Sequence, residues 1–91
     1  MESTLPNPVK NVASNIRKIR EYKGYTQDYL AAKLKISQNA YSKLELGYSK
    51  LTVERLFKIS TILGLEAKLL ISLDEHELIK HIAKDNSLVI V

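Results

Sequence analysis

Apolar residues recur every three or four positions through the first two thirds of the chain, the spacing of helices that bury one side. This spacing predicts four helices, of which the second is QDYLAAKL. Helix-starting residues and helix-ending glycines mark their bounds: Asn7, Thr26, Ser37 and Thr52 at the starts, and Gly24, Gly47 and Gly64 at three of the ends. The residues of the fourth helix expected to face the core are Val53, Leu56, Ile59, Ile62 and Leu63.

The pattern changes after Gly64, where the segment EAKLLISL alternates apolar and polar positions. This alternation predicts a strand over residues 66–73. Asp74 and Glu77 resemble a capping box that opens a helix over EHELIKHIAK, and the β-branched end SLVIV predicts a second strand over 87–91. Because a lone strand edge is unstable, strand 66–73 is expected to pair with its mate in a second copy or with residues 87–91 of its own chain.

The sequence therefore predicts a mostly α fold of four to five helices with a C-terminal strand–helix–strand extension. Three segments are expected: a flexible arm at 1–7, a helical domain at 8–65, and an extension at 66–91 for dimerisation or partner binding. The extension carries more apolar surface than so small a protein can leave in water. The residues expected at the dimer contact are Leu69, Ile71, Leu73, Leu78, Ile82 and Val89.

The third helix has an unusual polar side. At 100° per residue, one side carries Ser37, Ala40, Tyr41 and Leu44, and the opposite side carries Gln38, Asn39, Ser42 and Lys43. The second set supplies amides, a hydroxyl and an amine without the Glu–Lys pairs common on solvated helices. Two interpretations follow: an ordinary solvated face, or a face whose side chains meet hydrogen-bonding groups other than water.

Charge is distributed unevenly along the chain. The net charge is +4, but residues 10–50 hold nine basic against three acidic side chains. A basic segment favours a polyanionic partner. The chain has no cysteine, so neither disulfides nor thiolate metal sites are expected. It has no apolar run of membrane-spanning length and no signal-peptide core, so we expect a cytoplasmic protein.

The segment from IRKIREYKGYTQDYLAAKLKISQNAYSKLELG to LTVERLFKISTILGL resembles the Cro/C1-type helix-turn-helix family of bacterial and phage repressors over about residues 12–65. The resemblance rests on order and spacing of these residues: Ile16, Arg17, Arg20, Thr26, Gln27, Leu30, Ala31, Ile36, Ser37, Gln38, Leu44, Glu45, Gly47, Leu63 and Gly64. It implies a lambda-repressor-like fold whose third helix lies in the major groove of double-stranded DNA.

The resemblance also implies roles for individual residues. Gln38, Asn39 and Lys43 are expected to contact bases, with Ser42 as a secondary contact. Ser37, at the start of the same helix, is also expected among the DNA-binding residues. Gln27 is expected to lie against a phosphate and beside Gln38. The remaining expected backbone contacts are Gly47, Ser49 and Lys50, with Arg17 and Lys10 as weaker phosphate candidates whose alternative role is plain solvated charge.

Three further positions are expected to shape the helix-turn-helix unit. The family pairs the positions of Arg20 and Glu45, so a structural salt bridge is implied that orients the third helix. Lys35 occupies a turn position where glycine is common, which predicts a left-handed backbone. Tyr41 replaces a small aliphatic residue, and its ring is expected in the core with its hydroxyl at solvent or a phosphate.

No catalytic or cofactor site is predicted. His76 and His81 are five residues apart, which does not place two metal ligands on one helical face. The expected function is a transcriptional regulator, most simply a repressor, that binds a palindromic operator as a homodimer at the nucleoid. The alternative is the antitoxin of a toxin–antitoxin pair, which binds its operator and neutralises a toxin through its tail. A protein-interaction module that has lost DNA binding is a third hypothesis, opposed by Gln27, Gln38 and the basic segment.

Overall fold

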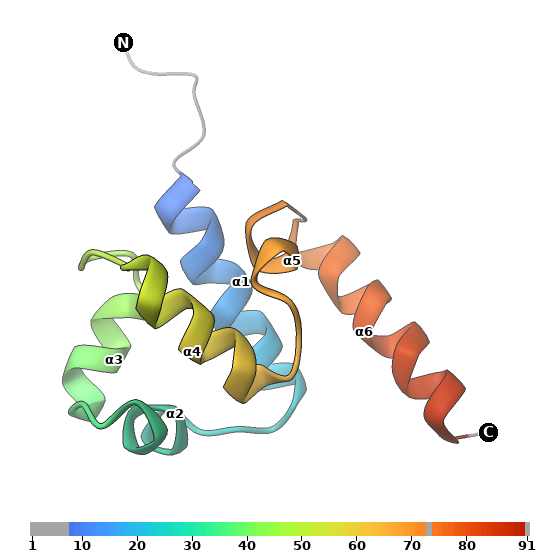
Figure 1. Cartoon of the computed structure of the whole chain (residues 1–91), viewed down its shortest axis with the longest axis horizontal. Coiled ribbons are helices and arrows are strands. Elements are labelled where there is room, and N and C mark those ends of the chain that lie inside the picture. Colours follow the sequence, from blue (N-terminus) through green and yellow to red (C-terminus); the bar gives the residue numbers. More distant parts are fainter. Residues whose placement is uncertain (1–7, 73, 91) are drawn as a thin grey trace, which may run out of the picture.

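Residues 8–72 and 74–90 are described by a computed structural model, and every element within them is a helix (Figure 1). The helices are α1 (Pro8–Tyr22), α2 (Gln27–Leu34), α3 (Gln38–Glu45), α4 (Val53–Leu63), α5 (Ala67–Ser72) and α6 (Glu75–Ile90). In Figure 1, α2 and α3 lie on one side of α1 and α4, while α5 and α6 lie on the other. None of the described helices is both long and apolar enough to cross a membrane.

The predicted helix starts are confirmed at three positions. The side-chain oxygens of Thr26, Ser37 and Thr52 each accept a hydrogen bond from the backbone N–H three residues later, at 3.0, 3.0 and 3.1 Å. Asp74 caps α6 in the same way, since its Oδ1 accepts from the N–H of Glu77 at 2.8 Å. These bonds satisfy donors that the first turn of a helix leaves unpaired, and therefore fix where each helix begins.

Lys35 adopts the predicted left-handed conformation, with φ 60° and ψ 42°. Its N–H donates to the carbonyl of Ala32 at 3.1 Å, and the N–H of Ile36 donates to the carbonyl of Ala31 at 3.0 Å. Two carbonyls at the end of α2 are thereby satisfied. The conformation costs about 1 kcal/mol for a residue with a Cβ, but it makes the tight turn that brings α3 against α2.

One hydrophobic core runs through all six helices. Each of the six helices contributes at least one side chain that is completely or nearly completely buried. These side chains are Ile16, Ile19, Leu30, Tyr41, Ile59, Leu63, Leu70 and Leu78. Because α1 packs against α3, α4, α5 and α6, it is the central element of this core.

The predicted strand at 66–73 is wrong, because Ala67–Ser72 form helix α5. Ala67 and Leu70, three residues apart, point into the core, whereas alternation had placed Leu70 on the outer side. The predicted strand at 87–91 is also wrong over 87–90, which continue helix α6; Val91 lies outside the described residues. Strand pairing, within the chain or between two copies, therefore has no support in the described part of the fold.

The core also crosses the predicted boundary after Leu65. A buried amide of α1 makes this connection, since Asn15 Nδ2 donates to the backbone oxygen of Leu70 at 2.8 Å. Leu78 and Ile82 of α6, with exposures of 0% and 6%, belong to the same core cluster as Ile16. The segment beginning at residue 66 is thus packed as part of the helical unit.

Of the six residues predicted at a dimer contact, two are core residues of the single chain and a third packs partly against that core. Leu78 and Ile82 are buried within the single chain, so they are corrected to core residues, and Leu69 is partly buried against that core. Ile71 alone among the described ones is exposed, at 57%. Leu73 lies outside the described residues, and Val89 lies in the last turns of α6, where its side chain is outside the description.

One residue predicted to face the core does not. Val53, in the first turn of α4, is 69% exposed and lines an apolar groove between α4 and α5. Ala40, which the spacing places on the same side of α3 as Tyr41 and Leu44, is exposed. The core-facing stripe of α3 is therefore limited to Tyr41, Leu44 and Glu45.

Candidate nucleic-acid interface

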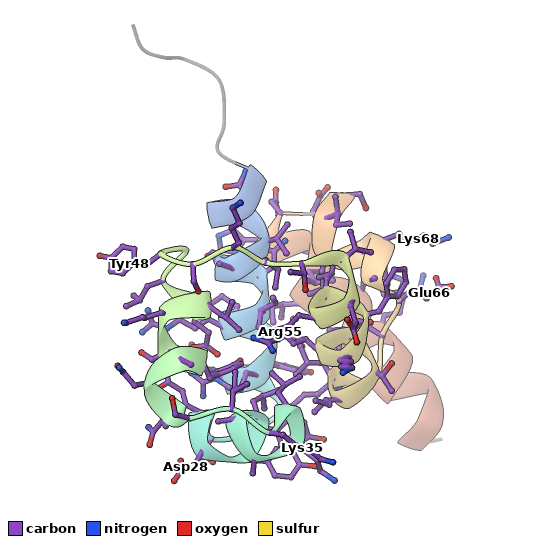
Figure 2. All side chains as sticks on the ribbon, turned by 60° about the vertical axis from the view of Figure 1, so that its left-hand side comes forward. Asp28, Lys35, Tyr48, Arg55, Glu66 and Lys68 are labelled. Atoms are coloured by element: carbon purple, nitrogen blue, oxygen red, sulfur yellow. The ribbon has the colours of Figure 1, made fainter. Side chains whose placement is uncertain are left out.

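Helices α2 and α3 are joined by residues 35–37 and pack directly against each other. The outward side of α3 carries Gln38, Asn39 and Lys43 as exposed side chains, with Ser42 half-buried. Ser37 is engaged in capping, since its Oγ accepts from the N–H of Ala40. Figure 2 shows α3 forming one edge of the molecule, with α4 and α5 away from it. Two amides and one amine are thus presented together at an unobstructed helix surface.

Arg20 and Glu45, which were expected to pair, form a bidentate ion pair between α1 and α3. Arg20 Nε lies 2.6 Å from Glu45 Oε2, and Arg20 Nη2 lies 3.1 Å from Oε1. Their side chains are only 10% and 1% exposed. Arg20 Nη1 also donates to the backbone oxygen of Tyr25 at 2.8 Å, which fixes the connection between α1 and α2. The guanidinium of Arg20 therefore fixes α1, α3 and the loop between α1 and α2 relative to one another.

Two more donors complete the coordination of the Glu45 carboxylate. Gln27 Nε2, from the start of α2, donates to Oε1 at 3.1 Å, and the hydroxyl of Tyr41 donates to Oε2. The ring of Tyr41 is buried as predicted, but the prediction that its hydroxyl reaches solvent or a phosphate is wrong. Each carboxylate oxygen thus accepts two hydrogen bonds. We call Arg20, Gln27, Tyr41 and Glu45 the buried polar network.

Gln27 lies where it was expected, but its side-chain amide has an additional partner within the protein. It does lie at the amino end of α2, but its amide nitrogen is oriented by Glu45. One N–H of that amide is used inward, which leaves the second N–H and the carbonyl oxygen for an external partner. The buried polar network thereby fixes the direction in which Gln27 presents these groups.

The electrostatics of this network favour a charged carboxylate. Burial by itself raises the pKa of Glu45, but hydrogen bonds from Arg20, Tyr41 and Gln27 outweigh it and hold the pKa below its ordinary value. The hydrogen bond to Glu45 raises the pKa of Arg20, so the guanidinium remains charged. Burial, together with the bond to Glu45, raises the pKa of the Tyr41 hydroxyl, so it stays a neutral donor.

These directions predict how stability depends on pH. Because the pKa of Glu45 is lower in the folded than in the unfolded chain, its contribution is present above about pH 4.5 and is lost as pH falls through the folded value. The free energy of unfolding, measured with urea between pH 7 and pH 3, should therefore decrease on acidification. The Glu45→Gln variant should be less stable at pH 7 and should lose less on acidification.

Glu54→Gln is the matched control for that experiment, because Glu54 is an exposed carboxylate on α4. It removes one surface charge of the same sign without touching the buried polar network. Equal acid dependence in the Glu45→Gln variant and the parent would contradict the assignment of this carboxylate as a source of the acid sensitivity.

The expected backbone-contacting residues lie in the loop after α3 and on α1. Gly47 has a φ of 76°, Ser49 is half-buried and Lys50 is exposed. Arg17 is exposed but pairs with Glu21 at 3.2 Å, so its charge is partly compensated within α1. The side chain of Lys10 lies outside the described residues.

One exposed residue of this surface was missed from the sequence. Tyr48 is 74% exposed, directly between Gly47 and Ser49, and Figure 2 shows it projecting outward beyond the end of α3. The available signal was its position in the loop that the resemblance placed along the DNA backbone. A tyrosine there offers a hydroxyl donor and an aromatic face on the outer side of the molecule.

Comparisons with known proteins agree with this geometry. A family model described as helix-turn-helix matches residues 16–70. One similar solved structure is the clp gene regulator ClgR from C. glutamicum, which is 26% identical with a TM-score of 0.68 and covers 72% of this chain and 86% of that chain. Another is a hypothetical transcription factor, NHTF, from Neisseria, which is 25% identical with a TM-score of 0.70 and covers 88% of this chain and 94% of that chain.

A second ClgR structure, from Corynebacterium glutamicum, is 21% identical with a TM-score of 0.72, covers 93% of this chain and 90% of that chain, and shows likeness of fold alone. No curated protein sequence matches the chain. The matched segment includes α2, the left-handed turn at Lys35, α3 and the buried polar network. The chain therefore belongs to the Cro/C1-type helix-turn-helix family of DNA-binding proteins.

Proposed function

We propose that the chain is a sequence-specific transcriptional repressor that binds a palindromic double-stranded DNA site as a homodimer, in the cytoplasm at the nucleoid. The observation that carries this proposal is the exposed pair of amides, Gln38 and Asn39, in the first turn of α3. They stand on a helix held in one orientation by a buried ion pair. Two regulators of transcription among the similar structures support the same assignment.

Base recognition is assigned to α3. Its first residues enter the major groove, where an amide side chain can pair with the N6 and N7 atoms of adenine in a bidentate way. Gln38 and Asn39 have this chemistry, and Lys43, one turn later, can reach the O6 and N7 acceptors of guanine. Ser42 is a secondary contact, since it is half-buried.

Phosphate contacts are assigned to the two sides of α3. On one side Gln27 presents the amide N–H that Glu45 leaves unused. On the other side lies the loop with Gly47, Ser49 and Lys50, to which the exposed Tyr48 is added. Such contacts position the protein and supply most of the salt-dependent affinity. The balance of nine basic against three acidic side chains in residues 10–50 has the sign that a polyanion requires.

The antitoxin alternative loses one of its arguments, the C-terminal strand at residues 66–73. It rested on a C-terminal strand and on an apolar tail that needed a partner. Residues 67–72 form a helix, and Leu78 and Ile82 are covered by the chain's own core. We therefore propose a regulator acting through α3 as the function that the described residues support best.

The proposal is tested by selecting a preferred site from a randomised duplex pool and measuring affinity by fluorescence anisotropy. Gln38→Ala should weaken binding to that site by about 1–3 kcal/mol and relax discrimination at one base pair. Lys50→Ala should weaken binding to all sequences alike and reduce the slope of affinity against salt by about one.

Asn11→Ala removes another exposed amide, on α1, and serves as the control. It should leave both the affinity and the preferred sequence unchanged. If Gln38→Ala binds the selected site as tightly and as selectively as the parent, α3 is not the recognition helix and the proposal is wrong.

A further inference from the structure

The carboxylate of Glu45 has all of its acceptor positions filled. A carboxylate offers about four lone-pair positions, shared equally between its oxygens. Oε2 accepts from Arg20 Nε at 2.6 Å and from the hydroxyl of Tyr41, while Oε1 accepts from Arg20 Nη2 and from Gln27 Nε2, each at 3.1 Å. Because the guanidinium takes one position on each oxygen, Tyr41 and Gln27 divide the positions that remain.

The hydroxyl of Tyr41 occupies the remaining position on Oε2. Tyr41 precedes Glu45 by about one turn of α3, and its side chain is 0% exposed, so the hydroxyl is out of reach of solvent. Gln27 comes from the start of α2 and is half-buried. With Oε2 filled, the amide of Gln27 has Oε1 as its acceptor on this carboxylate. Since a carboxylate only accepts hydrogen bonds, the amide must turn its nitrogen inward, in one orientation.

We infer that Tyr41 is a positioning residue for DNA binding: its hydroxyl keeps Gln27 on Oε1 and thereby directs the outward N–H of Gln27 toward a phosphate. This role rests on the proposed function, in which Gln27 contacts a phosphate, and it adds a buried residue to those that determine affinity. Without the hydroxyl, Oε2 offers a second acceptor position, and the amide of Gln27 can turn between the two oxygens. Binding is then weaker, because a side chain that must be ordered at an interface costs free energy.

Phenylalanine at position 41 separates the effect of the hydroxyl from that of the ring. The two bonds from Arg20 to Glu45 do not involve Tyr41, so they continue to join α1 and α3 in the Tyr41→Phe variant. The ring still fills its place in the core. We therefore expect α3 to keep its orientation, so that an effect on DNA binding comes through the acceptor position that the hydroxyl has left.

The first test is fluorescence anisotropy with the selected duplex and with a duplex of random sequence. Tyr41→Phe should raise the dissociation constant about three- to tenfold on both, which is the scale of one net hydrogen bond. Equal loss is expected because a phosphate contact carries no sequence information, and the dependence on salt should be unchanged because Gln27 is neutral. Tyr22→Phe is the matched control, since Tyr22 is 44% exposed on α1 outside the buried polar network, and it should leave binding unchanged.

A mutant cycle with Gln27→Ala shows whether Tyr41 acts through Gln27. Gln27→Ala should itself weaken binding, and Tyr41→Phe should cause no further loss once the amide is absent. A second readout needs no DNA. The side-chain amide resonances of Gln27, assigned by their absence from the Gln27→Ala spectrum, should shift in Tyr41→Phe and stay in place in Tyr22→Phe.

Several results would overturn the positioning role. Tyr41→Phe that binds like the parent, or that leaves the Gln27 resonances in place, shows that the hydroxyl does not restrain the amide. Equal losses from Tyr41→Phe with and without the Gln27 amide place the effect elsewhere, and relaxed discrimination between sequences means that the hydroxyl orients α3 instead. Gln27→Ala that binds like the parent removes the phosphate contact itself. Each of these results is independent of Gln38→Ala, which alone decides whether α3 is the recognition helix.

Discussion

A chain truncated after Leu65 is expected to lose its cooperative fold. Truncation removes four buried residues, Ala67, Leu70, Leu78 and Ile82, from the core that they share with α1 and α4. Loss of a single large core side chain costs about 2–5 kcal/mol, and the whole stability of a small domain is about 5–15 kcal/mol. Losing Leu70, Leu78 and Ile82 together is therefore expected to remove most or all of the free energy of unfolding of the remaining helices.

The truncation also disrupts a polar contact. The amide of Asn15, which is only 4% exposed, donates to the backbone oxygen of Leu70 and would lose that acceptor. Far-UV circular dichroism during urea unfolding is the measurement, with loss of the cooperative transition as the expected result. A chain ending at Lys84 is the matched control, since it retains all four buried residues and should unfold cooperatively.

A smaller change tests the same packing. Leu78→Ala should lower the free energy of unfolding by about 2–5 kcal/mol, because Leu78 is completely buried in the full chain. If the chain ending at Leu65 unfolded with the midpoint of the full chain, then α5 and α6 would contribute nothing to the core described above.

Removal of either member of the Arg20–Glu45 ion pair is expected to lower the free energy of unfolding by about 3–5 kcal/mol. The reason is that the remaining charge stays buried without its partner. The side chain of Glu45 is 1% exposed, so water cannot replace the guanidinium. Arg20→Met, Glu45→Leu and the double variant form a mutant cycle, in which urea unfolding should show strong coupling between the two positions.

The chain offers its own control for this cycle. Arg17 and Glu21 form an exposed ion pair at 3.2 Å on the same helix as Arg20, with side chains 53% and 43% exposed. A cycle on this pair should give a coupling of only about 0.3–0.5 kcal/mol. Equal coupling in the two cycles would mean that burial does not determine the strength of the Arg20–Glu45 interaction.

The first four helices were predictable because each carries a local signal that agrees with its tertiary environment. Thr26, Ser37 and Thr52 cap the helices they were expected to cap, and Gly64 adopts a left-handed conformation at the end of α4. Apolar residues at helical spacing, such as Ile59 and Leu63, then face the core. Local and long-range preferences point to the same structure in this part of the chain.

Helix α5 was mispredicted because six residues are too short for periodicity to separate a helix from a strand. Ala67, Leu69 and Ile71 alternate along the sequence, but the packing of α1 selects the pair Ala67 and Leu70. The β-branched residues of SLVIV favour a strand locally, yet residues 87–90 continue a helix whose earlier turns are anchored by Leu78 and Ile82. In both segments tertiary contacts decide the outcome.

The candidate site was only partly predictable for a similar reason. The polar side of α3 follows from spacing alone, and so could the bond between Tyr41 and Glu45, which are four residues apart on one helix. The bond from Gln27 to Glu45 joins residues 18 apart in sequence and depends on how α2 crosses α3. No local pattern contains that information.

On α3, the residues that fix the position of the helix are separate from the residues proposed to contact DNA. This separation makes the protein a suitable starting point for engineering new DNA-binding preferences. The residues that fix the helix, Tyr41, Leu44 and Glu45, are buried, whereas Gln38, Asn39 and Lys43 are exposed. Exposed helix positions tolerate substitution at a cost of a few tenths of a kcal/mol. A combinatorial library at these three surface positions should therefore consist largely of folded members, so that selection acts on recognition instead of on stability.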